Sequence, residues 1–142
     1  MSVKIPDRLH IKKSYEKDFK DLLEKDSPLS KKGNKHIFIM GMVMGFYNVS
    51  RVPLDKKEQF VRIEYLNDDD KSLIKAIAIN EENDLNILLD EERVYSIAEE
   101  YASGGIKYLK EMVLIKEYGS FIKKFETYLL DKFNKLKLGK NE

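Results

Sequence analysis

The residues best suited to chemistry are basic side chains gathered in the first part of the chain. Four of them are the candidates for contact with nucleic-acid phosphates, namely Arg8, Lys12, Lys13 and Arg51. Lys and Arg bind phosphates without regard to base sequence, because the attraction is electrostatic and releases counterions. The four lie in or beside a predicted strand and predicted loops, from which side chains can reach a phosphate. A brief strand followed by a helix also invites comparison with β-ribbon proteins that read DNA.

Acidic side chains form four clusters farther along the chain, at residues 68–70, 81–84, 90–92 and 99–100. Clustered carboxylates can bind a hard cation when a loop shapes them. Asp84 begins a segment similar to a calcium loop, but Leu89 stands where the sharp turn of that loop requires Gly. Other clusters fall at predicted helix starts, where carboxylates stabilise the helix end. We therefore expect no metal site from these residues.

Most other catalytic chemistry is excluded by residue counts and missing motifs. The chain has no cysteine and only two histidines, His10 and His36, which rules out thiol catalysis, iron–sulfur clusters and His-rich metal sites. No serine lies in a G-x-S-x-G motif, and neither a Walker loop nor a G-x-G-x-x-G motif is present. The sequence therefore predicts no catalytic residue, no metal and no cofactor, and we expect that the protein is not an enzyme.

Charge is distributed unevenly although the net charge is only +1. Residues 1–35 carry a net +4, residues 36–62 a net +2, residues 63–100 a net −9 and residues 101–142 a net +4. Such a distribution could steer a charged partner toward one region. It could equally let the basic ends pack beside the acidic middle, and we favour this structural interpretation.

The chain that carries these residues is predicted to be mainly α. It has 142 residues, 42% of them hydrophobic, which suffices for one sizeable core. No repeat or linker divides it, so we expect a single helical domain over residues 1–142 with about six helices and a frayed tail at 139–142. The apolar spacing predicts helices over 15–25, 36–47, 71–79 and 91–102, from residue 106, and after Gly119, with Ser14 and Asp90 as N-caps. Residues 8–11 fit a very short strand, and residues 59–66 fit a short strand and a helix equally well.

Four glycines are candidates for close helix packing. Gly41 and Gly45 are four residues apart, hence on one face of an apolar helix, where a neighbouring helix can approach closely. Gly104 and Gly105 follow the helix predicted over 91–102. They form either a tight turn between two helices or a packing point within one bent helix. We favour the turn.

The chain is expected to be cytoplasmic. No apolar stretch follows its first residues, as a secretory signal would require. The longest apolar run, residues 37–47, is about half the ~20 residues that a membrane-spanning helix needs. We expect no membrane partner, and the sequence leaves open whether the chain forms a homo-oligomer.

Several patches resemble the Dnd system-associated proteins, a small family of unknown biochemical function encoded beside DNA phosphorothioation (Dnd) genes. The similar patches span roughly residues 7–113 and are Asp7-Arg8-Leu9 with Tyr15 and Leu22, residues 37–46, Arg51-Val52-Pro53-Leu54, Ala76-Ile77-Ala78 and residues 97–106. The last patch is the most specific. The chain departs from the family at Ser103, where the family has Asn. The resemblance implies an accessory role in a DNA modification or restriction system used against foreign DNA, and it carries no catalytic residues to transfer.

Three functions remain open at this point. The first is a non-enzymatic accessory of such a defence system that binds a partner protein of the system or duplex DNA non-specifically. The second is a small DNA-binding transcriptional or antitoxin-like regulator that uses residues 8–13 as a DNA arm. The third is a small metal-dependent hydrolase or nuclease with a dispersed acidic site. We favour the first.

Overall fold

A computed structural model describes residues 6–24, 29, 32–114 and 118–139. The chain forms two compact units, residues 1–110 and residues 111–142, and each is described by itself. A single domain over residues 1–142 stays a prediction. Among the described residues, no helix is long and apolar enough to cross a membrane.

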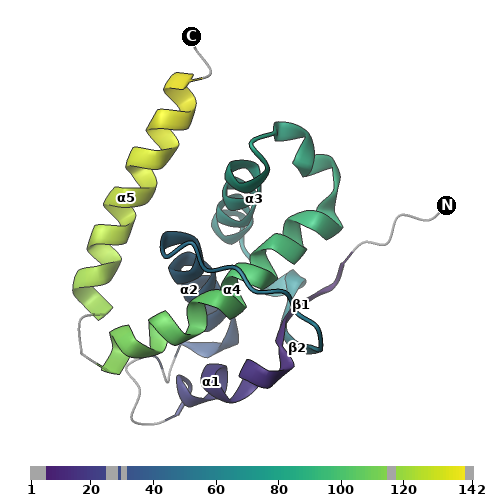
Figure 1. The fold of residues 1–142 in the computed structure, drawn as a ribbon, viewed down its shortest axis with the longest axis vertical. Helices are drawn as coiled ribbons and strands as arrows, with labels where there is room; N and C mark the ends of the chain where they lie inside the picture. Colours follow the sequence, from purple (N-terminus) through teal and green to yellow (C-terminus); the bar gives the residue numbers. More distant parts are fainter. Residues whose placement is uncertain (1–5, 25–28, 30–31, 115–117, 140–142) are drawn as a thin grey trace, which may run out of the picture. The chain divides into compact units, whose positions relative to one another are not determined.

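The predicted mainly α architecture is confirmed (Figure 1). The described residues form five α-helices and two short strands, joined in part by three 3₁₀ segments (η). The order is β1 (Arg8–Lys12), η1 (Lys13–Tyr15), α1 (Glu16–Asp21), α2 (Gly33–Tyr47), β2 (Lys57–Arg62), η2 (Ile63–Tyr65), α3 (Asp68–Glu82), η3 (Leu85–Leu89), α4 (Glu91–Leu114) and α5 (Tyr118–Gly139). The count is below the expected six because two predicted helices are one, α4.

The two strands pair as an antiparallel ribbon. Arg8 lies opposite Arg62 and Lys12 opposite Lys57, with an irregularity between Leu9 and His10. Leu9 and Ile11 are fully buried, whereas Arg8, His10 and Lys12 are partly exposed. Strand β1 therefore has the alternation of a half-buried strand. The strand predicted at 8–11 is thus confirmed. The segment 59–66 is a strand only in its first part, because η2 turns the chain from residue 63.

The outer edge of β1 is covered by α4. The backbone N–H of His10 donates to Glu99 Oε2 at 2.5 Å, and the N–H of Lys12 donates to Ser103 Oγ at 3.0 Å. The spacing matches, because two residues along a strand and four residues along a helix both advance about 6 Å. Two polar side chains of α4 therefore satisfy an edge that would otherwise expose unpaired N–H groups.

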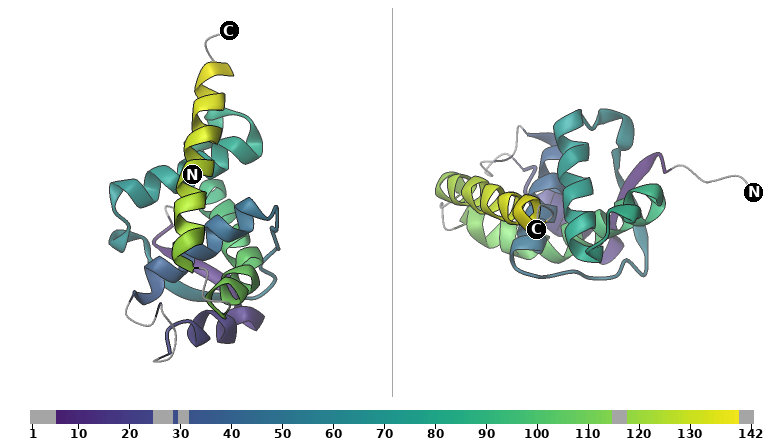
Figure 2. Two further views of the ribbon diagram at one scale, coloured as in Figure 1. Left: turned by 90° about the vertical axis from the view of Figure 1, so that its left-hand side faces the viewer. Right: turned by 90° about the horizontal axis from the view of Figure 1, so that it is seen from above.

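Close contact between α2 and α4 explains why Gly104 and Gly105 do not form the turn that we favoured. A Cβ added to Gly105 would overlap with the Gly41 carbonyl and the Gly45 backbone, and one added to Gly104 would overlap with the Ser50 carbonyl. At Gly41 an added Cβ would lie 3.0 Å from the Ala102 carbonyl oxygen. The glycines thus let backbones touch while α4 continues unbroken to Leu114. Figures 1 and 2 show helices α2 and α4 in three views.

The start of the first helix also differs from the prediction. Ser14 is not its N-cap, because η1 holds residues 13–15 and Tyr15 occupies the cap position without a side-chain hydrogen bond. Lys13 N–H donates to the Lys56 carbonyl at 2.8 Å, which keeps this segment tied to the ribbon. Helix α1 ends at Asp21, and residue 25, the expected end, lies outside the described residues.

Helices α3 and α4 begin within acidic clusters, as the sequence predicts. Asn67 and Asp70 form a reciprocal capping box at α3, which extends beyond the predicted residues 71–79 to Glu82. Asn83 then takes a left-handed conformation with φ of 53°. At α4 the Asp90 carboxylate accepts from the Arg93 N–H at 3.1 Å, so the predicted cap is confirmed.

Helix α5, in the second unit, is confirmed as the helix predicted after Gly119. The Phe125 and Tyr128 rings lie 6.2 Å apart, and Leu130 and Phe133 are 63% and 59% exposed. Of the predicted frayed tail, Gly139 is the last helical residue, and residues 140–142 lie outside the described residues.

Candidate functional site

A cleft of about 570 Å³ opens between β1 and the first half of α4, and we call it the ribbon–helix cleft. Its volume lies within the roughly 300–1,000 Å³ typical of small-molecule sites. The ribbon side contributes Pro6, Asp7, Arg8, His10 and Lys57, and the helix side contributes Asp90, Glu92, Arg93, Tyr95, Ser96 and Glu99.

A histidine–carboxylate pair joins the two walls. Glu99 is 5% exposed, and its Oε2 lies 2.9 Å from His10 Nδ1. Burial raises the pKa of Glu99, although the hydrogen bonds from His10 and the charge of Lys57 oppose that shift. Glu99 is bonded to Nδ1 of His10, and the His10 side chain lines the cleft. No residue that the structure describes forms a hydrogen bond with Nε2 of this ring.

The remaining charges of the cleft differ in how far they are neutralised. Arg93 is held by Glu82, with Nη2 to Oε1 at 2.6 Å. Arg8 and Lys57 have no ion-pair partner within the described part of the chain. On the helix wall, burial and the nearby Glu91 raise the pKa of Tyr95, so its hydroxyl keeps its proton. Among the described residues, the ribbon wall therefore has two cations without an ion-pair partner beside one carboxylate, Asp7, whereas the helix wall carries Asp90, Glu92 and Glu99.

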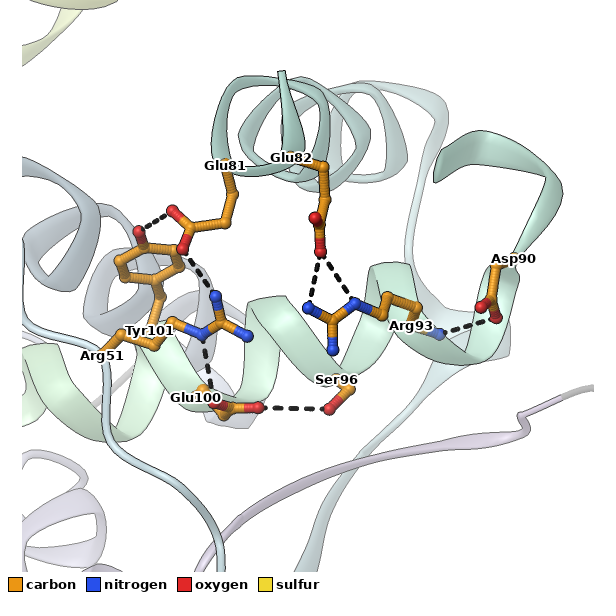
Figure 3. Close-up of polar contacts among 8 residues, drawn as sticks. All are labelled: Arg51, Glu81, Glu82, Asp90, Arg93, Ser96, Glu100 and Tyr101. Carbon is orange, nitrogen blue, oxygen red and sulfur yellow. Dashed lines mark hydrogen bonds and ion pairs between the residues drawn. The ribbon is translucent and has the colours of Figure 1, made fainter. Parts of the chain in front are cut away.

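A second polar cluster lies beside the cleft on α4, and we call it the arginine network (Figure 3). It consists of Arg51, Glu81, Glu100 and Tyr101. Arg51 Nη1 lies 2.6 Å from Glu81 Oε1, and Arg51 Nε lies 3.0 Å from Glu100 Oε1. The Tyr101 hydroxyl donates to Glu81 Oε2. The network thus connects α3 and the loop before β2 to α4.

The network fixes the charge state of its members. The hydrogen bond from Tyr101 lowers the pKa of Glu81, and the guanidinium of Arg51 lowers it further. Burial would lower the pKa of Arg51, but the hydrogen bonds to Glu100 and Glu81 raise it above its ordinary value. Burial and the hydrogen bond to Glu81 raise the pKa of Tyr101. Arg51, Glu81 and Tyr101 therefore keep their usual charge near neutral pH.

The four predicted phosphate contacts do not share one environment. Arg8 lines the cleft, and Lys13 is exposed in η1. Lys12 is on β1 with Nζ 3.8 Å from Asp55 and 5.3 Å from the centre of the Tyr15 ring. Arg51 is held between two carboxylates of the arginine network. The structure thus places Arg8 and Lys12 on one strand and Arg51 in an ion cluster.

Sequence reasoning did not single out the pair His10 and Glu99, nor Arg62 of the ribbon. A signal for the first pair exists, since His10 is two residues from Arg8 on a strand and thus on the same face. Glu99 and Ser103 are four residues apart beside the buried Ala98 and Ala102, which marks a polar pair on a buried helix face. Lys57 and Arg62 are brought beside β1 only through strand pairing, which no local pattern specified.

The described residues contain no group of three His, Cys, Asp or Glu side chains arranged to hold a metal ion. Comparison with curated proteins and comparison with solved structures each give no match. The family model described as DNA sulphur modification system-associated protein 4 matches residues 8–135, which include the ribbon, the arginine network and all of the cleft except Pro6 and Asp7. The chain therefore belongs to this family of DNA sulphur modification system-associated proteins.

Proposed function

We propose that this protein is a non-enzymatic, cytoplasmic accessory of the DNA sulphur modification system that acts by binding the phosphate backbone of duplex DNA. The observation that carries the proposal is the outward face of the ribbon. Arg8, Lys12, Lys57 and Arg62 form two like-charged pairs directly opposite each other on this face. We call these four residues the basic ribbon face.

Folding does not explain the basic ribbon face. Like charges directly opposite each other destabilise a strand pair, so the ribbon gains no stability from them. The nearby carboxylates neutralise them little. Lys12 Nζ lies 3.8 Å from Asp55, which is 76% exposed, and Arg62 pairs at 3.2 Å with Glu64, which is 65% exposed. Exposed pairs of this kind contribute little to stability, so a phosphate can compete for the cations.

A two-stranded ribbon is also a shape that DNA accepts, since the major groove admits one. The sequence suggested Arg51 as a phosphate contact, but Arg51 forms ion pairs with Glu81 and Glu100. We therefore expect Lys57 and Arg62, rather than Arg51, to contact phosphates. Lys13, exposed just beyond the end of β1, extends the same basic surface. Binding by such a surface is electrostatic and indifferent to base sequence.

The test is titration of the pure protein against a labelled duplex at several salt concentrations, followed by fluorescence anisotropy. Each phosphate contact contributes about −0.9 to the slope of log affinity against log salt. The double variant Lys57→Ala/Arg62→Ala should flatten that slope by roughly two and weaken binding to all duplexes alike. The matched control is Lys71→Ala/Lys75→Ala on α3, which removes the same charge away from the ribbon and should bind as the wild type does.

The proposal is wrong if the wild type does not bind duplex at about 50 mM salt, where phosphate contacts are strong. It is also wrong if the ribbon variant and the α3 control weaken binding equally, because the effect would then come from net charge alone.

A partner protein of the same system is the second candidate ligand. The observation that favours it is the exposure of three leucines in η3, namely Leu85 at 48%, Leu88 at 36% and Leu89 at 86%. Contiguous exposed apolar side chains mark interaction sites. Co-expression with the other proteins of the system, comparing the wild type with Leu85→Ser/Leu89→Ser, would test it. Co-purification that the variant loses supports this candidate, and unchanged co-purification contradicts it.

A further inference from the structure

We propose that the ribbon–helix cleft binds a single nucleotide, with its phosphate on the ribbon wall and its sugar and base on the helix wall. The inference deepens the proposed function, because one wall of the cleft belongs to the basic ribbon face, but it concerns the open cleft between β1 and α4 rather than the outward face of the ribbon. The nucleotide is either free or a unit of an unpaired strand, since both present the same chemistry to the cleft.

The ribbon wall supplies the donors that a phosphate needs. Arg8 and Lys57 line the cleft with no ion-pair partner in the described chain. His10 lies between them in position along β1 and faces the cleft with the ring held by Glu99. The Nε2 side of this ring is thus open to a ligand in the cleft. Arg8, His10 and Lys57 thus line one wall of the cleft, where a phosphate can contact more than one of them.

The helix wall disfavours the phosphate itself. A helix N-terminus can attract an anion, but α4 begins with Glu91 and Glu92, and the Asp90 carboxylate already accepts from the Arg93 N–H. Arg93 is neutralised by Glu82. This wall is therefore negative, and a phosphate is directed to the ribbon wall.

The same carboxylates suit the rest of a nucleotide. Asp90 and Glu92 line the cleft as acceptors, which is the role that a carboxylate plays toward the hydroxyls of a ribose. Tyr95 is half-buried in this wall and offers a ring on which a base can stack, an interaction indifferent to the identity of the base. A ligand with an anionic end and a hydroxyl-bearing end satisfies both walls, whereas a simple anion satisfies only one.

Charge counts support this distinction. The titratable groups that face the cleft are Arg8, His10, Lys57 and Arg93, with Asp7, Asp90, Glu92, Tyr95 and Glu99. Carboxylates are at least as numerous as permanent cations, so the cleft as a whole does not attract anions. Affinity must come from a ligand that places its charge on one wall only.

The experiment is isothermal titration of the full chain with AMP, adenosine and inorganic phosphate at low salt. We expect AMP to bind at one site per chain and at least tenfold more tightly than either adenosine or phosphate. Lys57→Ala and Tyr95→Ala should each weaken AMP binding about tenfold, because one removes a phosphate donor and the other the stacking ring. Tyr65→Ala is the matched control, since Tyr65 lies in η2, is 62% exposed and does not line the cleft.

The inference is overturned if AMP does not saturate a site, or if phosphate binds as tightly as AMP, which would indicate an anion site only. Equal losses in Tyr95→Ala and Tyr65→Ala would also overturn it. A further titration with a short single-stranded oligoadenylate identifies the source of the nucleotide. Tighter binding than AMP indicates an unpaired strand, and equal or weaker binding indicates a free nucleotide.

Failure of this inference and failure of the proposed function are distinguishable. Tyr95→Ala leaves the cations of the basic ribbon face in place, so it should bind duplex DNA as the wild type does. Duplex binding without AMP binding would sink the nucleotide site alone. AMP binding without duplex binding would sink the proposed DNA contact alone.

Discussion

The ribbon–helix cleft and the arginine network are built on consecutive residues of α4, yet they leave their charges in opposite states. Glu99 faces the cleft, and Glu100 faces the network. In the network each carboxylate is paired with Arg51, and the Tyr101 hydroxyl is bonded to Glu81. In the cleft, Arg8, Lys57 and His10 Nε2 keep unused bonding capacity among the described residues. A saturated cluster stabilises the fold, whereas an unsaturated one beside an opening is available to a ligand.

The two carboxylates Glu81 and Glu99 express this difference in their proton affinity. Glu81 accepts hydrogen bonds from Tyr101 and Arg51, and its pKa is lowered. Glu99 is more deeply buried and is bonded to a histidine rather than to a permanent cation, and its pKa is raised. The pKa of a glutamate is thus lowered where Tyr101 and Arg51 donate hydrogen bonds to it and raised where burial dominates.

Breaking the crossing that supports both regions should have the largest effect. Gly45→Ala adds a Cβ that overlaps with the carbonyl oxygen of Tyr101. A backbone atom cannot move aside as the end of a flexible side chain could. We expect a loss of about 3 kcal/mol in the free energy of unfolding, measured by urea denaturation. Because residue 101 lies directly after Glu99 and Glu100, ligand binding in the cleft should weaken as well.

The control for this substitution is Gly33→Ala. A Cβ at Gly33 would meet no atom within 4 Å, and the only cost arises from its positive φ of 81°. That cost is about 1 kcal/mol. Equal losses in the two variants would mean that the crossing tolerates a Cβ and that Gly45 is not a packing point.

Removing the centre of the arginine network should have the next largest effect. Arg51→Ala removes the cation that pairs with both Glu81 and Glu100. Hydrogen bonds to charged groups contribute about 2 kcal/mol to the free energy of unfolding. The free energy of unfolding should fall by about that amount, while affinity for duplex DNA should not change. Arg62→Ala is the opposite case, with a stability change within about 0.5 kcal/mol and a clear loss of DNA affinity. Loss of DNA affinity in Arg51→Ala would contradict the division between the two regions.

Much of the fold could be predicted because its determinants are local. The capping residues Asn67 and Asp90, the alternation around Leu9 and Ile11, and the apolar spacing of the helices all lie in short segments. The turn expected at Gly104 was wrong because a glycine pair has two uses, and only the backbone of α2 against α4 decides between them. That contact joins residues about 60 positions apart, and no local pattern reports it.

The candidate site could be predicted only in part for the same reason. Arg8 and Lys12 were candidates because they are basic and lie in or beside the strand predicted at residues 8–11, near predicted loops. The sequence predicts Arg51 as an accessible cation, because its partners Glu81 and Glu100 are 30 and 49 residues away and no local pattern reveals them. His10 and Glu99 are separated by 89 residues, and only the lateral contact of α4 with the edge of β1 brings them together. Long-range contacts therefore determine which charges are free, and the sequence determines only which are present.

The smallest expected effect is the most direct test of the contrast between Glu81 and Glu99, and it is a pH dependence. The folded-state pKa of Glu81 lies below its ordinary value of 4.5, so its stabilising contribution is present above that pH and is lost as pH falls through the folded-state value. The folded-state pKa of Glu99 lies above 4.5, so its contribution is present below 4.5 and is lost as pH rises through the folded-state value. Urea denaturation of the wild type, Glu81→Gln and Glu99→Gln between about pH 3 and pH 7 separates the two contributions. On acidification the stability advantage of the wild type over Glu81→Gln should shrink, and its advantage over Glu99→Gln should grow. Slopes of the same sign would show that the cleft carboxylate is as fully paired as the one in the network, and the contrast between the two regions would be lost.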